Sequence, residues 1–218
     1  MEIPVLYEDA QLIVCIKPAG VLSEEGGMPE LLQTRCGCSR VYCVHRLDKP
    51  VSGVMVYAKD GKTAAKLSEL LSSHRVTKEY LAVVQGRPEA EQGILRDLLF
   101  HDARKNKTYV VQRSRKGVKE AELEYAALES LHSAEFGSLS LLRITLHTGR
   151  SHQIRVQFAS RKLPLAGDRR YGSSISDCGI ALQSHRLAFP HPVTGEPLCF
   201  SAPFPQEWPW NGFSAPTP

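Results

Sequence analysis

The chain has 218 residues, of which 42% are hydrophobic and 23% charged, a composition typical of a globular protein that can bury one core. Charged residues, Pro or Gly interrupt every apolar run well before the ~18 residues that a membrane-spanning helix needs, so no membrane protein is expected. The formal net charge of +4 is too small to indicate a nucleic-acid partner by itself.

The N-terminus and the cysteines favour a cytoplasmic protein. Met1-Glu2-Ile3-Pro4 lacks the basic patch and apolar stretch of a secretory signal, and the six cysteines are expected to be reduced thiols. Cys36, Cys38 and Cys43 could seed a metal site, but no Cys-x-x-Cys pair or His cluster completes a tetrahedral set. Free thiols and no bound metal are therefore expected.

The first part of the chain predicts two strands and one helix. An apolar run over residues 12–16 ends at Lys17-Pro18-Ala19-Gly20 and predicts a strand followed by a turn. Residues 54–58 predict a buried strand, and residues 63–73 have the apolar spacing of an amphipathic helix. The polar, Gly-rich residues 23–43 predict little.

The middle of the chain predicts mainly strands. Alternating patterns predict strands over residues 78–84 and 139–146. Residues 104–119 are expected to form two strands around a turn near residues 115–117, whereas residues 121–131 fit a strand or a helix.

The last part predicts a helix, a strand and a tail. Ser151 is the expected N-cap of a helix over residues 152–162, and residues 187–189 predict a strand. The Pro-rich tail from Ala202 is expected to be poorly ordered at its end. These elements predict an α+β fold in a single domain, residues 1–218, with a large mixed, mainly antiparallel sheet flanked by helices and loops.

The segment that most needs a chemical explanation is residues 45–53. Asp48 lies between Arg46 and Lys49, just before the strand predicted from residue 54. The two cations favour the ionised carboxylate, which can act as a nucleophile, a base or a metal ligand. A surface ion pair worth ~0–1 kcal/mol explains the segment equally well when it is read alone.

A second feature is the basic character of residues 104–119. This stretch has no acidic residue and seven basic ones: Arg104, Lys105, Lys107, Arg113, Arg115, Lys116 and Lys119. Such a segment could follow a phosphate backbone and make binding salt-sensitive. A solvated hairpin with a basic tip is the alternative.

Several separated segments resemble, in the same order, the motifs of the RluA-type RNA pseudouridine synthases. The first is His45-Arg46-Leu47-Asp48 with Ser52-Gly53, and the others are Lys78-Glu79-Tyr80-Leu81-Ala82, Thr148-Gly149-Arg150-Ser151-His152-Gln153-Ile154-Arg155, and Gly167-Asp168 with Tyr171-Gly172. Tyr7-Glu8-Asp9, Lys17-Pro18-Ala19-Gly20 and the segment from His191 to Glu196 also fit. The chain departs from the pattern at Val51, where many members have Thr, and at Gln157, where many have His.

The resemblance implies a central active-site cleft in which a uridine of RNA is isomerised without a cofactor or metal. It makes Asp48 the catalytic carboxylate, which either attacks the nucleoside or removes a ribose proton. It makes Arg155 the ion-pair partner of Asp48, with Arg150 as the alternative, and Tyr80 the residue that lies against the uracil and takes the C5 proton.

The resemblance also implies how RNA is held. The target base is turned out of its stack, and Arg46 occupies the space that it leaves. Arg169 and Arg170 join the basic segment in contacting the backbone. The substrate-binding residues expected from this comparison are Arg46, Arg104, Lys105, Lys107, Arg113, Arg115, Lys116 and Arg150. His45, Lys49, His152 and Asp168 are expected to be structural.

The expected protein is a catalytic domain without a separate N-terminal RNA-binding domain, and a monomer, because no long exposed apolar stripe is evident. Its expected partner is ribosomal or transfer RNA, with no membrane partner, and the sequence does not identify the uridine. An inactive RNA-binding module of the same fold remains the main alternative. A nucleoside or glycoside hydrolase is a second one, although no second carboxylate stands out beside Asp48.

Overall fold

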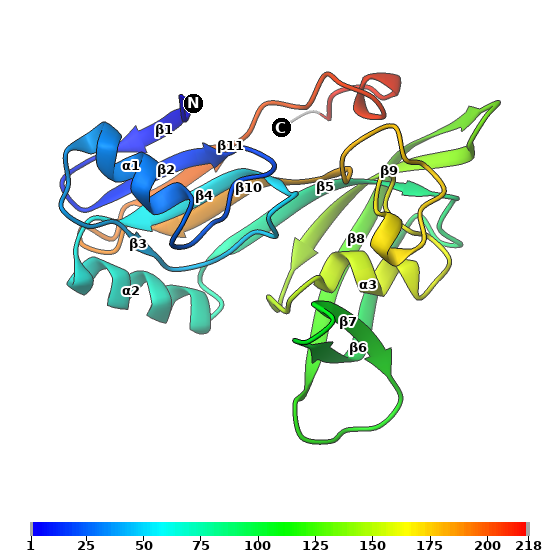
Figure 1. Ribbon diagram of the computed structural model, residues 1–218, viewed down its shortest axis with the longest axis horizontal. Helices are drawn as coiled ribbons and strands as arrows, with labels where there is room; N and C mark the ends of the chain where they lie inside the picture. The colour runs from blue at the N-terminus through cyan, green and yellow to red at the C-terminus, as the bar shows by residue number, and fades with distance from the viewer. Residues whose placement is uncertain (1, 217–218) are drawn as a thin grey trace. The chain divides into compact units, whose positions relative to one another are not determined.

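The computed structural model describes residues 2–216, which form eleven strands, three α-helices and two short 3₁₀ helices (Figure 1). The chain divides into two compact units. Unit 1 comprises the residues up to Glu79 together with Gln183–Pro203, and unit 2 comprises Tyr80–Leu182 together with the residues from Phe204 onward.

Unit 1 is built on a mixed sheet. Strands β1 (Val5–Glu8), β2 (Leu12–Lys17) and β4 (Ser52–Ala58) pair antiparallel in that order, and β3 (Tyr42–Cys43) also pairs antiparallel with β4. Strand β10 (Leu182–Pro190) pairs parallel with β4 and antiparallel with β11 (Pro197–Ser201). The parallel pair is what makes this sheet mixed.

Two helices accompany the sheet of unit 1, α1 (Met28–Cys36) and α2 (Gly61–Ser72). Helix α2 begins at Asp60, whose carboxylate accepts hydrogen bonds from the N–H groups of Lys62 and Thr63, as an N-cap should. Its apolar stripe, Leu67 and Leu70, lies in the same buried cluster as the side chains of β2 and β4. Burial of this stripe is the main stabilising contribution expected for such a short helix.

Unit 2 is built on long antiparallel strands. Its sheet order is β5-β9-β8-β6-β7, from strands β5 (Thr77–Gln85), β6 (Gln92–Asp102), β7 (Lys107–Val111), β8 (Val118–Ser133) and β9 (Gly137–Leu146). Helix α3 (Gln153–Ala159) contacts β6 and β7, where Val156 is buried with Leu99 and Ala121. The 3₁₀ helices are η1 (Arg169–Tyr171) and η2 (Trp210–Gly212).

The predicted α+β class with a large mixed sheet is confirmed. The strands expected over residues 12–16, 54–58, 78–84, 139–146 and 187–189 are all present, and most extend further than their patterns indicated. The helix expected over residues 63–73 is α2, and the ambiguous residues 121–131 belong to strand β8. The single-domain description stays a prediction.

The helix expected over residues 152–162 was placed wrongly at both ends. The N-cap of α3 is His152, not Ser151, with φ of 54°, and the helix ends at Ala159 rather than near residue 162. The two strands expected around the turn at residues 115–117 are present as β7 and the start of β8, and both pair with β6, which lies between them.

The Pro-rich tail is packed as far as Phe213, and the end that was expected to be poorly ordered includes residues 217–218, outside the described residues. Trp210 and Phe213 are buried with Leu81 and Leu139 of unit 2. Two large aromatic side chains therefore hold this segment against the core. None of the helices within residues 2–216 is long and apolar enough to cross a membrane.

Candidate active site

Asp48 lies in a tightly fixed turn of unit 1 that leads into β4. The N–H of Val51 donates to the carbonyl of Asp48 at 2.9 Å, which closes the turn over Lys49 and Pro50. The preceding residue, Leu47, is buried, and both its N–H and its carbonyl bond to the hydroxyl of Ser23, at 3.0 and 2.9 Å. The backbone on both sides of Asp48 is thus held in place.

The most informative neighbour of this turn is Lys17, which the sequence patterns did not single out. Its side chain is fully buried, and its ammonium group donates to the carbonyls of Pro18, Val21 and Lys49 at 2.9, 2.8 and 3.2 Å. Burial lowers the pKa of Lys17 to about 8, an effect that the negative charge of Asp48 opposes. Lys17 therefore ties the loop after β2 to the Asp48 turn and adds positive charge near the carboxylate.

Lys17 carried a visible sequence signal. It is a charged residue at the end of an apolar strand and directly before Pro-Ala-Gly, within a segment that already matched the resemblance. Lysine is rarely buried unless its charge is satisfied, and here the chain's own carbonyl oxygens satisfy it.

His45 is neutral, and its side chain accepts a hydrogen bond from the backbone of β4. Its Nε2 accepts a hydrogen bond from the N–H of Val56 at 3.1 Å. Burial, and secondarily the positive charge of Lys78, lower the pKa of His45 to about 4. This geometry agrees with the structural role expected for His45.

Arg46, on the other side of the turn, points its guanidinium toward solvent. It pairs with Glu24 at 3.0 Å, and its side chain remains 63% exposed. Such an exposed pair contributes little to stability, so Arg46 can exchange Glu24 for a ligand at small cost.

In unit 2, Tyr80 lies on β5, a strand of nearly continuous buried residues. Residues 80–84 are all buried, and because side chains alternate along a strand, Tyr80, Ala82 and Val84 share one face of it. Tyr80 is 7% exposed. Its ring is therefore positioned by packing and by the strand itself.

Arg155 and Asp168 form a buried ion pair in unit 2. The guanidinium Nε and Nη2 of Arg155 donate to the two carboxylate oxygens of Asp168 at 2.6 and 3.0 Å, and both side chains are almost fully buried. A bidentate pair fixes the plane of the guanidinium as well as its position. Asp168 therefore orients Arg155, a role more definite than the structural one expected for it.

A close backbone approach places Asp168. Gly167, the preceding residue, has φ of 78°, and a Cβ there would lie 2.1 Å from the carbonyl oxygen of Gly179. Only glycine fits at this position, so the Gly-Asp sequence is explained by geometry.

A hydrogen-bond network around Tyr171 connects the Arg155 pair to β7. The ring of Tyr171 lies 5.1 Å from the guanidinium carbon of Arg155. Its hydroxyl accepts the N–H of Thr108 at 2.8 Å and forms a hydrogen bond with His152 Nδ1 at 2.9 Å. Arg155 is thus linked to the basic segment through one aromatic side chain.

The turn before α3 is organised by Gln153 rather than by a cap at Ser151. The side-chain oxygen of Gln153 accepts hydrogen bonds from the Thr148 hydroxyl at 2.8 Å and the Arg150 N–H at 3.0 Å. Arg150 itself is exposed, and its Nε donates to the carbonyl of Glu120 at 2.9 Å. Arg150 and Arg155 therefore have very different surroundings, one solvated and one buried.

The departure at Gln157 has a clear structural role. Its side-chain nitrogen donates to the carboxylate of Asp97 at 2.7 Å and to the carbonyl of Leu95 at 3.2 Å. These bonds fasten α3 to β6, beneath the ion pair.

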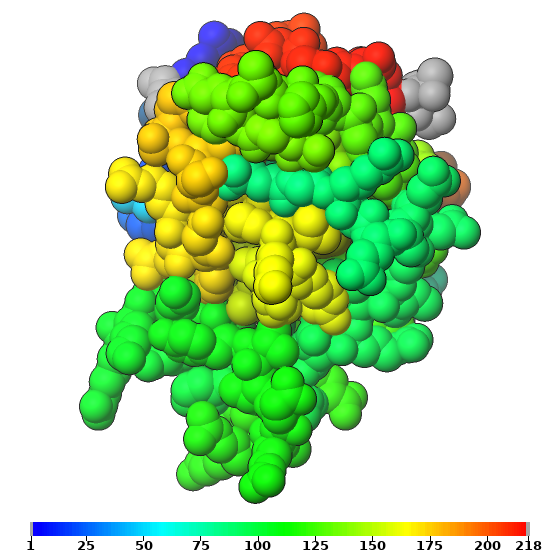
Figure 2. Space-filling model, turned by 90° about the vertical axis from the view of Figure 1, so that its right-hand side faces the viewer, coloured from blue at the N-terminus to red at the C-terminus, as the bar shows by residue number. Residues whose placement is uncertain are grey.

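The basic segment, residues 104–119, lies on the surface of unit 2 at β7 and the turn that follows it (Figure 2, green). Its members Arg104, Lys105, Arg113, Arg115, Lys116 and Lys119 are exposed, and Lys107 is half-buried. Arg170 reaches this segment and donates to the carbonyls of Lys105 and Asn106 at 3.1 and 3.3 Å.

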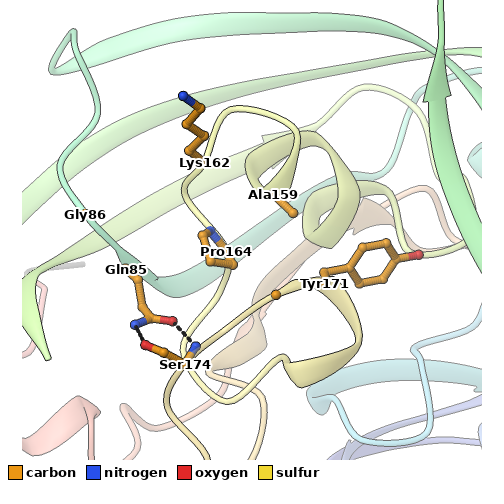
Figure 3. A pocket seen from close by; sticks show the side chains of 8 residues that line it. Gln85, Gly86, Ala159, Lys162, Pro164, Tyr171 and Ser174 are labelled. Carbon is orange, nitrogen blue, oxygen red and sulfur yellow. Dashed lines mark hydrogen bonds between the residues drawn. The ribbon is translucent and has the colours of Figure 1, made fainter.

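A shallow hollow of about 430 Å³ also opens on unit 2 (Figure 3). The side chain of Gln85 bonds to Ser174 there, at 2.7 and 2.9 Å. The described residues that line it include no carboxylate: Gln85, Gly86, Ala159, Lys162, Pro164, Tyr171, Gly172 and Ser174. Its titratable lining side chains are Lys162 and Tyr171, and it includes none of the catalytic residues expected from the sequence, Asp48, Tyr80 and Arg155.

Metal chemistry has no evident site in the part of the chain that the structure describes. No group of three or more His, Cys, Asp and Glu side chains within residues 2–216 is placed to hold a metal ion. All six cysteines are free thiols.

Comparisons with known proteins agree with the geometry. Residues 11–160, more than half of the chain, match the family described as RNA pseudouridylate synthase. An uncharacterized RNA pseudouridine synthase of Bacillus subtilis is 32% identical over 95% of this chain and 71% of its own length. Ribosomal large subunit pseudouridine synthase D of Nitrosomonas europaea is 32% identical over 93% of this chain and 62% of its own length. The chain thus spans about two thirds of these relatives.

Solved structures support the fold. Human RNA pseudouridylate synthase domain containing 4 matches with a TM-score of 0.76, covering 93% of this chain and 89% of the human chain at 24% identity. This likeness concerns the fold, whereas the sequence matches concern the family.

Proposed function

Because the chain belongs to the RNA pseudouridylate synthase family, and within it to the RluA type, a family of isomerases, we propose that it converts specific uridines of ribosomal or transfer RNA to pseudouridine. The bond from C1′ to N1 breaks, the uracil turns, and a bond from C1′ to C5 forms. The proton lost from C5 is balanced by one gained at N1, so the reaction needs no oxidant and no group donor.

The observation that carries the proposal is the fixed, charged turn at Asp48. The carboxylate projects from a turn whose backbone is held by Ser23 and Lys17, and the Lys17 ammonium supports its negative charge. A catalytic carboxylate must be ionised and held in one orientation, since misplacement costs much of the rate. Asp48 then acts on the nucleoside either as a nucleophile or as the base that removes a ribose proton.

Arg155 is the proposed partner that keeps the Asp48 carboxylate ionised and oriented during the reaction, and Asp168 is its positioning residue. The support is the bidentate pair, which holds the Arg155 guanidinium in one plane inside unit 2. Arg150, the alternative for this role, is exposed, and its guanidinium suits a phosphate of the RNA better than the half-buried carboxylate of Asp48.

Tyr80 is proposed to lie against the uracil and to accept the C5 proton. A rigid strand supports this role, because it keeps the ring plane constant while the base turns. The target nucleotide must leave its stack to reach these groups, which costs a few kcal/mol and favours bases in loops.

RNA is proposed to be held by exposed cations. Arg46 would enter the space that the base leaves, which its weak exposed pair with Glu24 permits. Residues Arg104, Lys105, Lys107, Arg113, Arg115 and Lys116, with Arg150, would contact phosphates and position the RNA without reading its sequence.

Ribosomal RNA is the first substrate to test, because the Nitrosomonas relative is named for the ribosomal large subunit. The proposal includes a cytoplasmic location, where that substrate is found, and a monomeric state without a cofactor.

The test is release of tritium from RNA that carries it at uridine C5. The purified chain would be incubated with ribosomal and transfer RNA transcripts separately, beside Asp48→Ala and the surface control Glu69→Gln on α2. The C5 hydrogen leaves only when C5 becomes the glycosidic carbon. Release by the native chain and the control, but not by Asp48→Ala, is the expected result, and it identifies the RNA pool.

Two results would contradict the proposal. Salt-sensitive RNA binding without release from either pool would favour the inactive binding module. Free uracil among the products would favour a hydrolase.

A further inference from the structure

The strands β6 and β7 present two different faces. Leu99 of β6 lies opposite Val110 of β7, and this pair faces α3, where it packs against Val156. Because side chains alternate along a strand, the next pair, Phe100 and Tyr109, points to the opposite face. Phe100 also lies opposite Val118 of β8, so an apolar row crosses three strands.

This row is partly exposed, most of all at Tyr109, and cations lie close to its rings. Tyr109 is 36% exposed, which is unusual for an aromatic residue in the centre of a strand. The guanidinium carbon of Arg115 lies 4.8 Å from the centre of the Phe100 ring, and the ammonium of Lys107 lies 5.8 Å from that of Tyr109. Each ring thus has one cation close to it.

The turn that brings Arg115 over Phe100 is itself well formed. The N–H of Val118 donates to the carbonyl of Arg115 at 3.0 Å, and Gly117 has the positive φ, 87°, that the reversal needs. Arg115 is therefore placed by the backbone as well as by its contact with the ring.

The nearest carboxylates do not cancel this positive field. Asp102 accepts the N–H groups of Arg104 and Lys105 at 3.0 and 3.2 Å, so it caps the turn between β6 and β7. On the face that carries Phe100, the next pair after Phe100 and Val118 is Leu98 and Glu120. The aromatic row therefore lies at the end of this face that carries Lys107 and Arg115, and the first glutamate of the face, Glu120, lies beyond the row.

We propose that Tyr109, with the Phe100–Arg115 stack beside it, binds unpaired bases of RNA by stacking. An exposed aromatic ring among cations is the chemistry that binds single-stranded nucleic acid, whereas a continuous duplex offers phosphates but no free base faces. The inference rests on the proposed function and narrows its substrate to RNA with unpaired bases next to the target, such as a loop.

Phosphate contacts and base stacking make separable contributions to the affinity for RNA. Phosphate contacts by Arg113 and Lys116 act on any RNA, single-stranded or paired. Stacking on Tyr109 acts only where a base is unpaired, and its loss is expected to weaken binding by about tenfold. Preference for unpaired RNA is thus the property that Tyr109 should control.

The test measures binding of the full chain to two labelled RNA probes, a uridine-containing single strand and a blunt duplex of equal length, at fixed salt. The variants are Tyr109→Ala, Tyr109→Phe and the control Ile94→Ala, which removes an exposed apolar side chain on the same face of β6 as Phe100 and six residues before it. Circular dichroism and thermal unfolding establish that each variant is folded.

Tyr109→Ala should bind the single strand about tenfold more weakly and the duplex equally well, while Tyr109→Phe and Ile94→Ala bind both like the native chain. Equal losses on both probes, or no loss, would overturn the inference, as would a loss with Tyr109→Phe equal to that with Tyr109→Ala. The same native sample assayed for pseudouridine separates the proposals. Tyr109-dependent binding without product refutes only the proposed function, and product without Tyr109 dependence refutes only this inference.

Discussion

Two aspartates of this chain have the same charge but different surroundings. Asp168 is almost fully buried, and both of its oxygens are engaged by one guanidinium. Asp48 is half-buried in a turn, next to the buried ammonium of Lys17. The first arrangement suits a fixed support and the second a group that must reach a substrate.

Replacing Asp168 by Asn should test the support role. The amide keeps the shape but leaves the buried Arg155 charge unbalanced, so the free energy of unfolding should fall by about 3 kcal/mol. Urea denaturation measures the change, with Glu122→Gln as a matched control, because Glu122 pairs with Arg96 at the surface. A loss no larger than that of the control, expected to be within about 1 kcal/mol, would refute the role.

Lys17→Met should show which of two opposed effects dominates at the Asp48 turn. Removing the cation relieves a burial cost of about 3 kcal/mol, from a pKa near 8. It also removes the Lys17 donor from the carbonyls of Pro18 and Val21, at about 1–3 kcal/mol each, whereas the Lys49 carbonyl keeps the Gly20 N–H. Net destabilisation of about 1 kcal/mol is therefore expected at pH 7.

The difference in the free energy of unfolding between the native chain and Lys17→Met should change with pH in one direction. The folded pKa of Lys17 lies below its unfolded value, so the unfolded chain binds more protons between pH 8 and about 10.5. Native stability should rise across that window relative to Lys17→Met, in denaturation curves at several pH values. Lys66→Met, on the exposed side of α2, serves as the control. A variant as stable as the native chain would contradict the account.

At the residue scale, the sequence identified candidates but not their partners. Asp48, Tyr80 and Arg155 were found from local motifs, and their roles remain proposals. The partnership of Arg155 with Asp168, and the contact of Lys17 with the Lys49 carbonyl, join residues well apart in the chain. Such pairs follow from tertiary packing, which no local pattern contains.

The elements were predictable where one periodicity dominated. Strands β2, β4, β5 and β9 and helix α2 follow clear apolar patterns. Helix α1 was missed because its segment is polar and Gly-rich, and its N-cap is Gly27, which has no side chain to signal a start. Helix α3 begins at a His in the left-handed region, a conformation that propensity does not suggest.

The parallel pair β4–β10 requires glycine at one position. Gly53 has φ of 129°, and a Cβ there would lie 2.2 Å from the backbone oxygen of Ser184. Gly53→Ala must separate the two strands, so the free energy of unfolding should fall by about 3 kcal/mol and the melting temperature by about 6–12 °C.

The control for this change is Gly61→Ala at the start of α2. A Cβ at Gly61 meets only the Tyr42 hydroxyl at 3.9 Å, so this variant should be as stable as the native chain or slightly more stable. Equal melting temperatures for the two variants would show that the close approach at Gly53 is not required.

For RNA binding by the molecule as a whole, the distribution of charge matters more than the net charge. The chain carries only +4, yet unit 2 holds the uninterrupted basic segment and Arg169 and Arg170. The sequence could indicate this segment, but not that β6 separates its two strands or that an aromatic row crosses it. Those features depend on pairing between distant segments.

RNA binding should therefore depend steeply on salt. Arg113→Gln with Lys116→Gln removes two exposed cations, which should reduce the slope of log affinity against log salt by about 1.4 for single-stranded RNA. Fluorescence anisotropy measures the slope over 50–300 mM salt, a range in which the Debye length falls from about 14 Å to about 6 Å. An unchanged slope would exclude these cations from the interface, and Arg87→Gln, an exposed cation outside the segment, is the control.

The central claim is that the Asp48 carboxylate performs the isomerisation. It is tested most directly by single-turnover formation of pseudouridine, quantified after digestion of the RNA to nucleosides, with the native chain and Asp48→Asn. The Asn side chain keeps the shape of Asp but cannot attack as a carboxylate or remove a proton. The account predicts RNA binding within about threefold of native and product formation slowed by at least about 10³-fold. Product formation within tenfold of the native rate would contradict it.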